Sequence, residues 1–211
     1  MILTVGHTKG GVGKTTLAIS LAVVLSNQGR DVLLVDGDEQ RTAMTFTELR
    51  TEQRGQPGYT TVSLQGAPLR TQVRQLVSKY DEIIIDVGGR DTGSLRAALT
   101  VSDMLLIPIQ PRSFDLWAMD QMTELIAEAR ELNEGLRALV VLNAADPQGT
   151  DNADTLDAVR ELEGLEVLSL TVGRRKAFSN AAAFGQAVTE YSPKDAKAID
   201  ELETLTAAIY D

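Results

Sequence analysis

The chain of 211 residues contains no cysteine and a single histidine, His7. The absence of cysteine excludes disulfide bonds, thiol nucleophiles and cysteine-ligated clusters, and it fits a reducing compartment. One histidine cannot build a histidine metal site, so we interpret His7 as a structural or solvated side chain. Aromatic residues make up only 4% of the chain, against 43% hydrophobic residues in all. The core is therefore expected to be aliphatic.

Basic residues are also few, because 20 lysines and arginines stand against 30 acidic residues, a net charge of −10. This balance argues against a protein whose whole surface binds nucleic acid, although a local basic patch is compatible with it. No apolar run reaches the ~20 residues of a membrane span. The N-terminus lacks the basic region and apolar stretch of a signal peptide. We expect a cytoplasmic protein with no membrane partner.

What the chain does contain is a regular alternation of strand and helix patterns. Short aliphatic runs predict strands that are covered on both faces. The predicted strands are Ile2–Gly6, Val32–Asp36, Ile83–Val87, Met104–Pro108, Leu139–Asn143 and Val167–Thr171, with a short extra strand near Thr61–Leu64. The predicted helices are Lys14–Asn27, Arg41–Gln53, Leu69–Ser78, Gly93–Ser102, Phe114–Leu132, Asp154–Leu162, Lys176–Ala183 and Pro193–Ile209. This order predicts a single α/β domain over residues 1–211, a doubly wound, mostly parallel sheet with helices on both faces.

The most informative segment is Lys9–Thr16, which reads KGGVGKTT. It follows the apolar run Ile2–Val5 and opens a helical pattern, and this is the context that a phosphate-binding loop requires. Glycines allow backbone N–H groups to close around phosphate oxygens, and the helix N-terminus adds a partial positive charge. We therefore expect Lys14 to contact the β- and γ-phosphates of a nucleotide and the Thr15 hydroxyl to bind Mg²⁺.

Aspartates stand at the ends of two further predicted strands. Asp36 and Asp38 follow one strand, and Asp86 ends the next strong one. An aspartate at a strand end near a phosphate loop can hold Mg²⁺, and a second can orient an attacking water molecule. Together with Lys14 and Thr15, these three carboxylates indicate a nucleotide site.

These motifs resemble the ParA/MinD family of deviant Walker-type P-loop ATPases, whose fold is that of the P-loop NTPases. The loop has the family's variant pattern, with a second lysine, Lys9, at its head and Thr8 where the standard pattern has glycine. Glu39 replaces the proline that is usual after the two aspartates. The matching segments are Lys9–Thr16, Asp36–Gln40, Ile83–Gly89, Leu106–Pro111 and Phe114–Leu116. The resemblance is closest to small partition ATPases that lack an N-terminal helix-turn-helix.

The resemblance implies ATP or ADP with Mg²⁺ as cofactors and an ATP-dependent homodimer, in which Lys9 reaches the nucleotide of the partner subunit. It assigns catalysis to Lys9, Lys14 and Asp38, and the metal to Thr15, Asp36 and Asp86. The expected nucleotide-binding residues are Lys9, Gly10, Gly11, Val12, Gly13, Lys14, Thr15 and Thr16, with Pro111 and Asn143 at the adenine.

Partition-type relatives bind DNA without sequence preference and are activated by a small DNA-binding or adaptor protein. The candidate DNA-binding residues are Arg174, Arg175 and Lys176, three adjacent cations in an acidic chain. Such a patch would attract phosphates, although an ordinary solvated charge run is the alternative. The ATP form is accordingly expected on the nucleoid, with plasmid DNA, chromosomal DNA or another cargo as the object that is moved.

Two other functions are compatible with the phosphate loop. One is a MinD-like regulator that cycles on a membrane, but the acidic C-terminal helix lacks the basic face that such binding favours. The other is a metabolic P-loop enzyme, such as a small kinase or a biotin-synthesis ligase, which would need a second substrate pocket that the sequence does not reveal.

Overall fold

The computed structural model describes residues 1–89, 92–111, 114–148 and 150–211. In these residues seven strands form one sheet in the order β3-β2-β4-β1-β5-β6-β7, and all neighbouring strands are parallel. The strands are β1 (Ile2–Val5), β2 (Val32–Asp36), β3 (Thr60–Ser63), β4 (Glu82–Asp86), β5 (Met104–Ile109), β6 (Arg137–Ala145) and β7 (Glu166–Gly173). The predicted α/β class with a doubly wound sheet is confirmed, and the sheet is entirely parallel.

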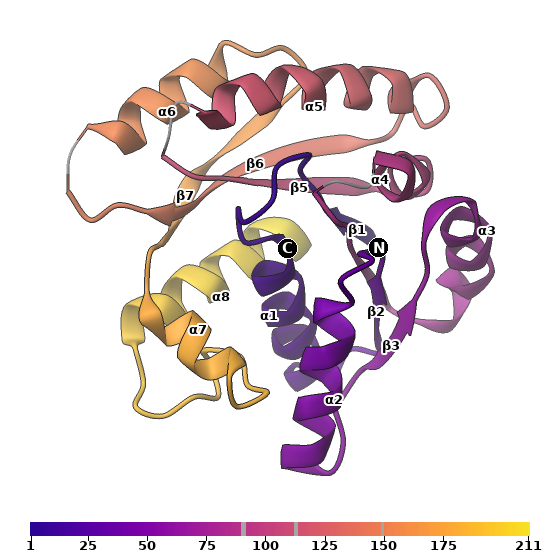
Figure 1. Cartoon of the computed structure of the whole chain (residues 1–211), viewed down its shortest axis with the longest axis vertical. Coiled ribbons are helices and arrows are strands. Elements are labelled where there is room, and N and C mark those ends of the chain that lie inside the picture. Colours follow the sequence, from indigo (N-terminus) through magenta and orange to yellow (C-terminus); the bar gives the residue numbers. More distant parts are fainter. Residues whose placement is uncertain (90–91, 112–113, 149) are drawn as a thin grey trace.

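Helices cover both faces of this sheet (Figure 1). They are α1 (Lys14–Asn27), α2 (Thr42–Arg54), α3 (Gly66–Leu76), α4 (Thr92–Leu99), α5 (Phe114–Arg130), α6 (Asp151–Arg160), α7 (Lys176–Ala182) and α8 (Ala196–Tyr210), with a 3₁₀ turn at Val77–Lys79. Helices α1, α2, α7 and α8 lie on one face, and α3 to α6 lie on the other. Within the described residues no helix is both long and apolar enough to cross a bilayer.

The aliphatic runs of the sequence follow from this double covering. In β2, Val32 and Leu34 pack toward α1, whereas Leu33 and Val35 pack toward the opposite helical layer. All four side chains are fully buried. Since successive strand residues point to opposite faces, a strand with two covered faces must be apolar throughout.

Five helix starts differ from the predicted positions, at α2, α3, α4, α6 and α8, and three of them have a local physical reason. The last helix begins at Ala196 and not at Pro193, because the Asp195 side chain accepts the Ala198 N–H at 3.1 Å and caps it. Helix α6 begins at Asp151. Acidic side chains in its first turn interact favourably with the partial positive charge at the helix N-terminus. Helix α2 begins after Arg41, whose φ of 52° lies outside the helical region.

A buried ion pair joins α2 to the segment between α7 and α8. The Arg50 guanidinium is 3% exposed and donates to both Glu190 carboxylate oxygens, at 2.7 and 2.9 Å. It also donates to the Gly185 carbonyl at 2.8 Å. Burial alone would raise the pKa of Glu190, but hydrogen bonds from Arg50 and Asn27 hold that pKa below its ordinary value. The 183–195 segment is thus fixed to the end of α2.

Replacing Glu190 with alanine should lower the free energy of unfolding by about 3 to 5 kcal/mol, because it leaves the Arg50 charge buried without a carboxylate. Urea denaturation followed by circular dichroism measures this. The matched control is Arg160→Ala, since the pair of Arg160 with Asp157 is exposed and should contribute at most about 1 kcal/mol. Equal effects of the two substitutions would contradict a structural role for the buried pair.

Candidate nucleotide-binding site

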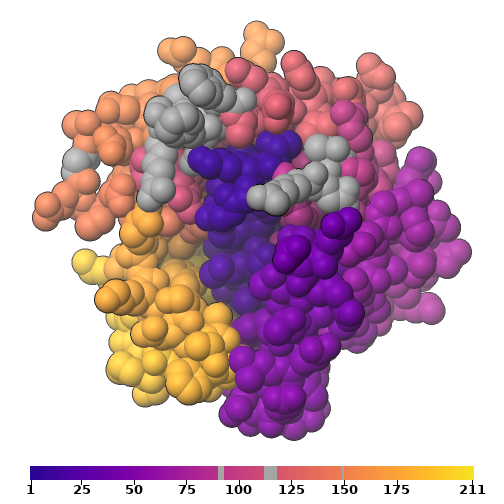
Figure 2. Space-filling model, viewed as in Figure 1, coloured from indigo at the N-terminus to yellow at the C-terminus, as the bar shows by residue number. Residues whose placement is uncertain are grey.

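The candidate site lies at the carboxyl ends of the central strands. Strand β1 is flanked by β4 and β5, which is the point where the strand order reverses and where ligands bind in such sheets. In the strand register, Val5 is opposite Asp86 and Asp36 is opposite Asp86. The glycine-rich loop after β1 and these carboxylates therefore meet at one edge. Figure 2 shows the indigo N-terminal residues at the centre of this face, between the purple residues of α2 and the golden residues around α7.

The loop wraps closely around the start of α1. Gly11 and Gly13 have φ angles of +77° and +96°, in the left-handed region that glycine enters without a steric penalty. The Lys14 ammonium donates to the Lys9 carbonyl at 2.7 Å, so the Lys14 side chain folds back across the loop. Burial lowers the pKa of Lys14, and the nearby Asp86 and Asp38 carboxylates counteract this shift.

The Asp86 carboxylate is buried in surroundings that suit a bound cation. Both of its carboxylate oxygens are buried, and within the described residues neither has a hydrogen-bond partner at normal geometry. Burial raises the pKa of Asp86 to about 7, and the Thr15 side chain close by lowers it in part. A divalent ion here would neutralise a buried charge and complete its coordination with water and phosphate oxygens, as Mg²⁺ usually does. Thr15 and Asp86 thus fit the predicted metal site.

The Asp36 carboxylate is hydrogen-bonded to the backbone around it. Its two carboxylate oxygens accept the N–H groups of Asp38, at 3.1 Å, and Met44, at 2.8 Å. Burial raises the pKa of Asp36, and these two N–H groups oppose the shift. The contacts fix the turn from β2 into α2. The described residues contain no group of three or more histidine or acidic side chains suited to hold a metal.

The segment after β4 lies between Asp38 and the phosphate loop. A Cβ atom on Gly88 would stand 2.9 to 3.1 Å from the Asp38 carboxyl group. A Cβ atom on Gly89 would stand 2.8 Å from backbone atoms of Lys9 and Gly10. Sequence reasoning gave these two glycines no role, although a Gly-Gly pair directly after a strand signals a close approach of backbone. This one segment thus approaches both Asp38 and Lys9, which are predicted to act in catalysis.

A pocket of about 210 Å³ opens beside the loop. Its walls include Gly13 and Thr16 from the loop, Gln110 and Asn143 from strand ends, and Phe178 from α7. Asn143 lines this pocket, and its base-binding role stays a prediction. The described lining includes Gln110 but not its neighbour Pro111, which is buried, so the role of Pro111 stays a prediction.

The three candidate DNA-binding cations have different surroundings. Arg174 and Arg175 line the pocket beside the phosphate loop. The Arg174 Nε atom lies 3.3 Å from an Asp146 carboxylate oxygen, and the Arg175 Nε donates to Glu201 at 2.9 Å. Lys176 is exposed and forms no ion pair within the part of the chain that the structure describes. The three side chains thus do not form one uniform basic surface.

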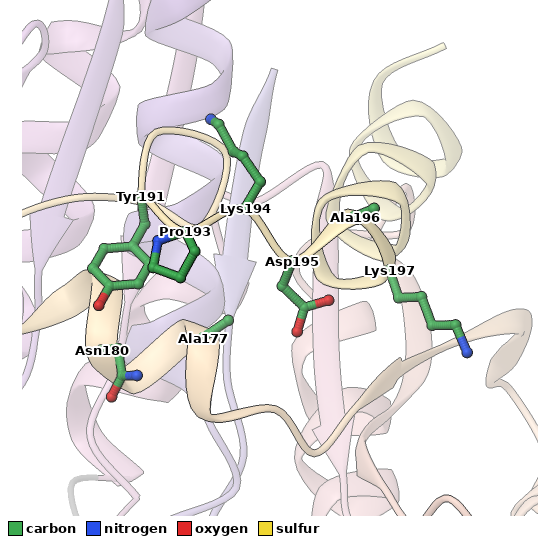
Figure 3. Close-up of a pocket in the computed structure, with 8 residues that line it drawn as sticks. All are labelled: Ala177, Asn180, Tyr191, Pro193, Lys194, Asp195, Ala196 and Lys197. Atoms are coloured by element: carbon green, nitrogen blue, oxygen red, sulfur yellow. The ribbon is translucent and has the colours of Figure 1, made fainter.

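A larger hollow, of about 430 Å³, lies between α7 and the start of α8. Figure 3 shows that the side chains of Lys194 and Lys197 point away from it, while Asn180 and Tyr191 stand at its other side. It has no glycine-rich backbone to receive phosphates. The smaller pocket next to the loop is the better nucleotide site.

Residues 3–188 match the family described as the CobQ/CobB/MinD/ParA nucleotide binding domain. The chain belongs to this family. It is 28% identical over 204 residues to the maintenance of carboxysome distribution protein A of Halothiobacillus neapolitanus, covering 96% of this chain and 93% of that protein. It is 27% identical over 219 residues to the chromosome-partitioning ATPase Soj of Thermus thermophilus, covering 90% and 88%.

The fold also matches that of cobyrinic acid a,c-diamide synthase from Mycobacterium smegmatis with a bound ATP analogue and magnesium. The TM-score is 0.79 at 21% identity, covering 99% of this chain and 93% of that one. The family predicted from the motifs is therefore confirmed. ATP and Mg²⁺, the cofactors expected from the sequence, are those that this structural neighbour binds in its analogue complex.

Replacing Gly88 with alanine should slow ATP hydrolysis while leaving ATP binding intact. The added methyl group must displace the Asp38 carboxylate, and a shift of about 1 Å in a catalytic group can reduce turnover by about 100-fold. Single-turnover hydrolysis and calorimetric titration separate the two steps. Gly135→Ala is the control, since a Cβ atom there meets nothing within 4 Å. A wild-type hydrolysis rate in Gly88→Ala would show that Asp38 needs no such positioning.

Proposed function

We propose that this protein is a ParA-type positioning ATPase. It binds ATP with Mg²⁺ at the phosphate loop, dimerises in that state, binds DNA without sequence preference and is released after hydrolysis. The observation that carries the proposal is the presence of two lysines on one loop, with Lys9 at its head and Lys14 at the start of α1. A single lysine suffices to hold phosphates within one subunit, and we assign the second lysine, Lys9, to the nucleotide of the partner subunit.

Within one subunit the chemistry follows from the site. Lys14 and the loop N–H groups bind the phosphates, and Thr15 and Asp86 would hold Mg²⁺, which would supply positive charge beside the phosphates. Asp38 lies half-buried beside Gly88, where it orients the attacking water molecule. The Lys9 backbone is held by the His7 ring at its N–H, at 2.9 Å, and by Lys14 at its carbonyl. Its side chain contacts the partner's phosphates and stabilises the charge that develops there.

The names of the curated relatives support a role in spatial organisation. One relative maintains carboxysome distribution and another partitions chromosomes. The cargo is therefore plasmid or chromosomal DNA or a large protein assembly, and a small DNA-binding or adaptor protein connects it to the ATPase. The DNA-bound dimer places the protein on the nucleoid in its ATP state.

Lys176 and Arg174 are the proposed DNA contacts. Arg174 is 45% exposed in spite of its ion pair with Asp146, so a DNA phosphate can compete for it. Arg175 is turned toward Glu201 and is 25% exposed, which favours a structural role for it. Two-fold symmetry doubles each contact in a dimer and thereby raises the effective concentration of the second site.

In Lys9→Ala, ATP should bind with unchanged affinity while the ATP-dependent dimer is lost, because the proposed contact of Lys9 across the subunit interface is removed. Asp38→Ala is the matched variant, and it should bind ATP, dimerise and hydrolyse very little. Calorimetry and multi-angle light scattering with ATP measure both properties. An intact ATP dimer in Lys9→Ala would argue against a contact of Lys9 across the subunits.

The double variant Arg174→Ala, Lys176→Ala should dimerise with ATP and lose most of its affinity for random-sequence duplex DNA. Losing two phosphate contacts per protomer should lower the slope of log affinity against log salt by about 2 per protomer. The control is Arg70→Ala, Arg74→Ala, which removes the same charge from exposed positions on α3. Fluorescence anisotropy with ATP, with ADP and without nucleotide measures binding. No ATP-dependent DNA binding of the wild type at low salt would refute the proposed function.

A further inference from the structure

Two side-chain amides hold consecutive carbonyl groups of the phosphate loop. The Gln110 Nε2 atom, just after β5, donates to the Gly11 carbonyl at 2.9 Å. The Asn143 Nδ2 atom, in β6, donates to the Val12 carbonyl at 2.7 Å. Asn143 approaches so closely that a Cβ atom on Gly13 would lie 2.1 Å from its Nδ2 atom. This contact gives a second reason for glycine at position 13, besides its φ of +96°.

These contacts fix the direction of two peptide N–H groups. In a planar trans peptide the carbonyl and the N–H point in opposite directions. Because the Gly11 and Val12 carbonyls point toward Gln110 and Asn143, the N–H groups of Val12 and Gly13 must point away from these two side chains. Within the described residues neither N–H donates a backbone hydrogen bond. Backbone N–H groups away from water need an acceptor, and a nucleotide phosphate supplies one.

We propose that Gln110 and Asn143 are positioning residues that orient the phosphate-binding N–H groups of Val12 and Gly13 before nucleotide arrives. The inference rests on the proposed function only in requiring that a nucleoside triphosphate binds this loop. Donors that are oriented in advance bind an anion without the cost of reorganising the loop. Asn143 then acts on the phosphate part of the ligand, in addition to any contact with the base that its place in the pocket permits.

The test uses neutral substitutions of similar size, Gln110→Met and Asn143→Leu, which keep volume and remove the amide donor. Their affinities for ATP, CTP and inorganic tripolyphosphate, each with Mg²⁺, are measured by calorimetry. The loss of one hydrogen bond that orients the loop should weaken binding by about tenfold. Because the loop contacts only phosphates, a loss of this size should appear with all three ligands, tripolyphosphate included. The control is Ser179→Ala, which alters the pocket wall without touching the loop carbonyls and should leave tripolyphosphate binding unchanged.

A second measurement requires no ligand. Backbone ¹⁵N relaxation in the nucleotide-free protein should show larger motion at Gly11, Val12 and Gly13 in both variants and unchanged motion in Ser179→Ala. Thermal unfolding confirms that each variant is folded at the temperature of the measurement. Global destabilisation alone would not change the relaxation of these three residues selectively.

The outcomes separate this inference from the proposed function. A loss confined to ATP, with CTP and tripolyphosphate unaffected, would mean that Asn143 contacts the base and does not position the loop. Unchanged affinities and unchanged loop motion would overturn the inference for both residues. If the wild type bound no nucleoside triphosphate, the proposed function would fail, while a selective gain of loop motion in the variants would still support the two amides as loop supports.

Discussion

The phosphate loop must stay ordered although some of its peptide N–H groups have no backbone acceptor within the described part of the chain. The rest of the structure depends on this constraint. A glycine-rich segment is flexible by nature, so its order has to come from neighbours. Lys14 contacts the Lys9 carbonyl, Gln110 the Gly11 carbonyl and Asn143 the Val12 carbonyl. These groups take up the carbonyl side of the loop and leave the opposite side for an anion.

The same constraint explains why the loop follows the central strand. Strands β4 and β2 lie on one side of β1, and β5 and β6 lie on the other. Asp36 and Asp86 come from the first side, and Gln110 comes from the second. Buried carboxylates and a buried lysine are costly unless they are paired or hydrogen-bonded. The raised pKa of Asp86 reflects this cost, and a bound cation would remove it.

Helix α2 provides a physical link between this site and the other end of the molecule. At its start, the Met44 N–H donates to Asp36. Near its end, Arg50 holds Glu190 and the Gly185 carbonyl in the segment before α8. A displacement of the β2–α2 turn therefore has a continuous path of hydrogen bonds to that segment. The link is a property of packing, and the sequence motifs around Asp36 contain no sign of it.

The sequence by itself determined the fold class, the family and the identity of the phosphate loop. Aliphatic strands covered on two faces have a distinctive pattern, and the KGGVGKTT segment has the spacing and the strand-to-helix context of a phosphate-binding loop. The positions of some elements were also predictable, since the strand β2 and the helix α1 have the predicted bounds. Helix starts were harder to predict from the sequence, because caps such as Asp195 depend on single local contacts.

Only the tertiary structure decided which distant residues touch the loop. Gln110 lies 99 positions from Gly11 in sequence, and Asn143 lies 131 positions from Val12. Their contacts arise because parallel strands β5 and β6 end at the same edge as β1. Likewise, the ion pairs of Arg174 and Arg175 with Asp146 and Glu201 distinguish them from Lys176, though the three are adjacent in the chain. Charge and spacing are local properties of a sequence. Which side chains form ion pairs, and which approach the phosphate loop, depends on how the strands and helices pack.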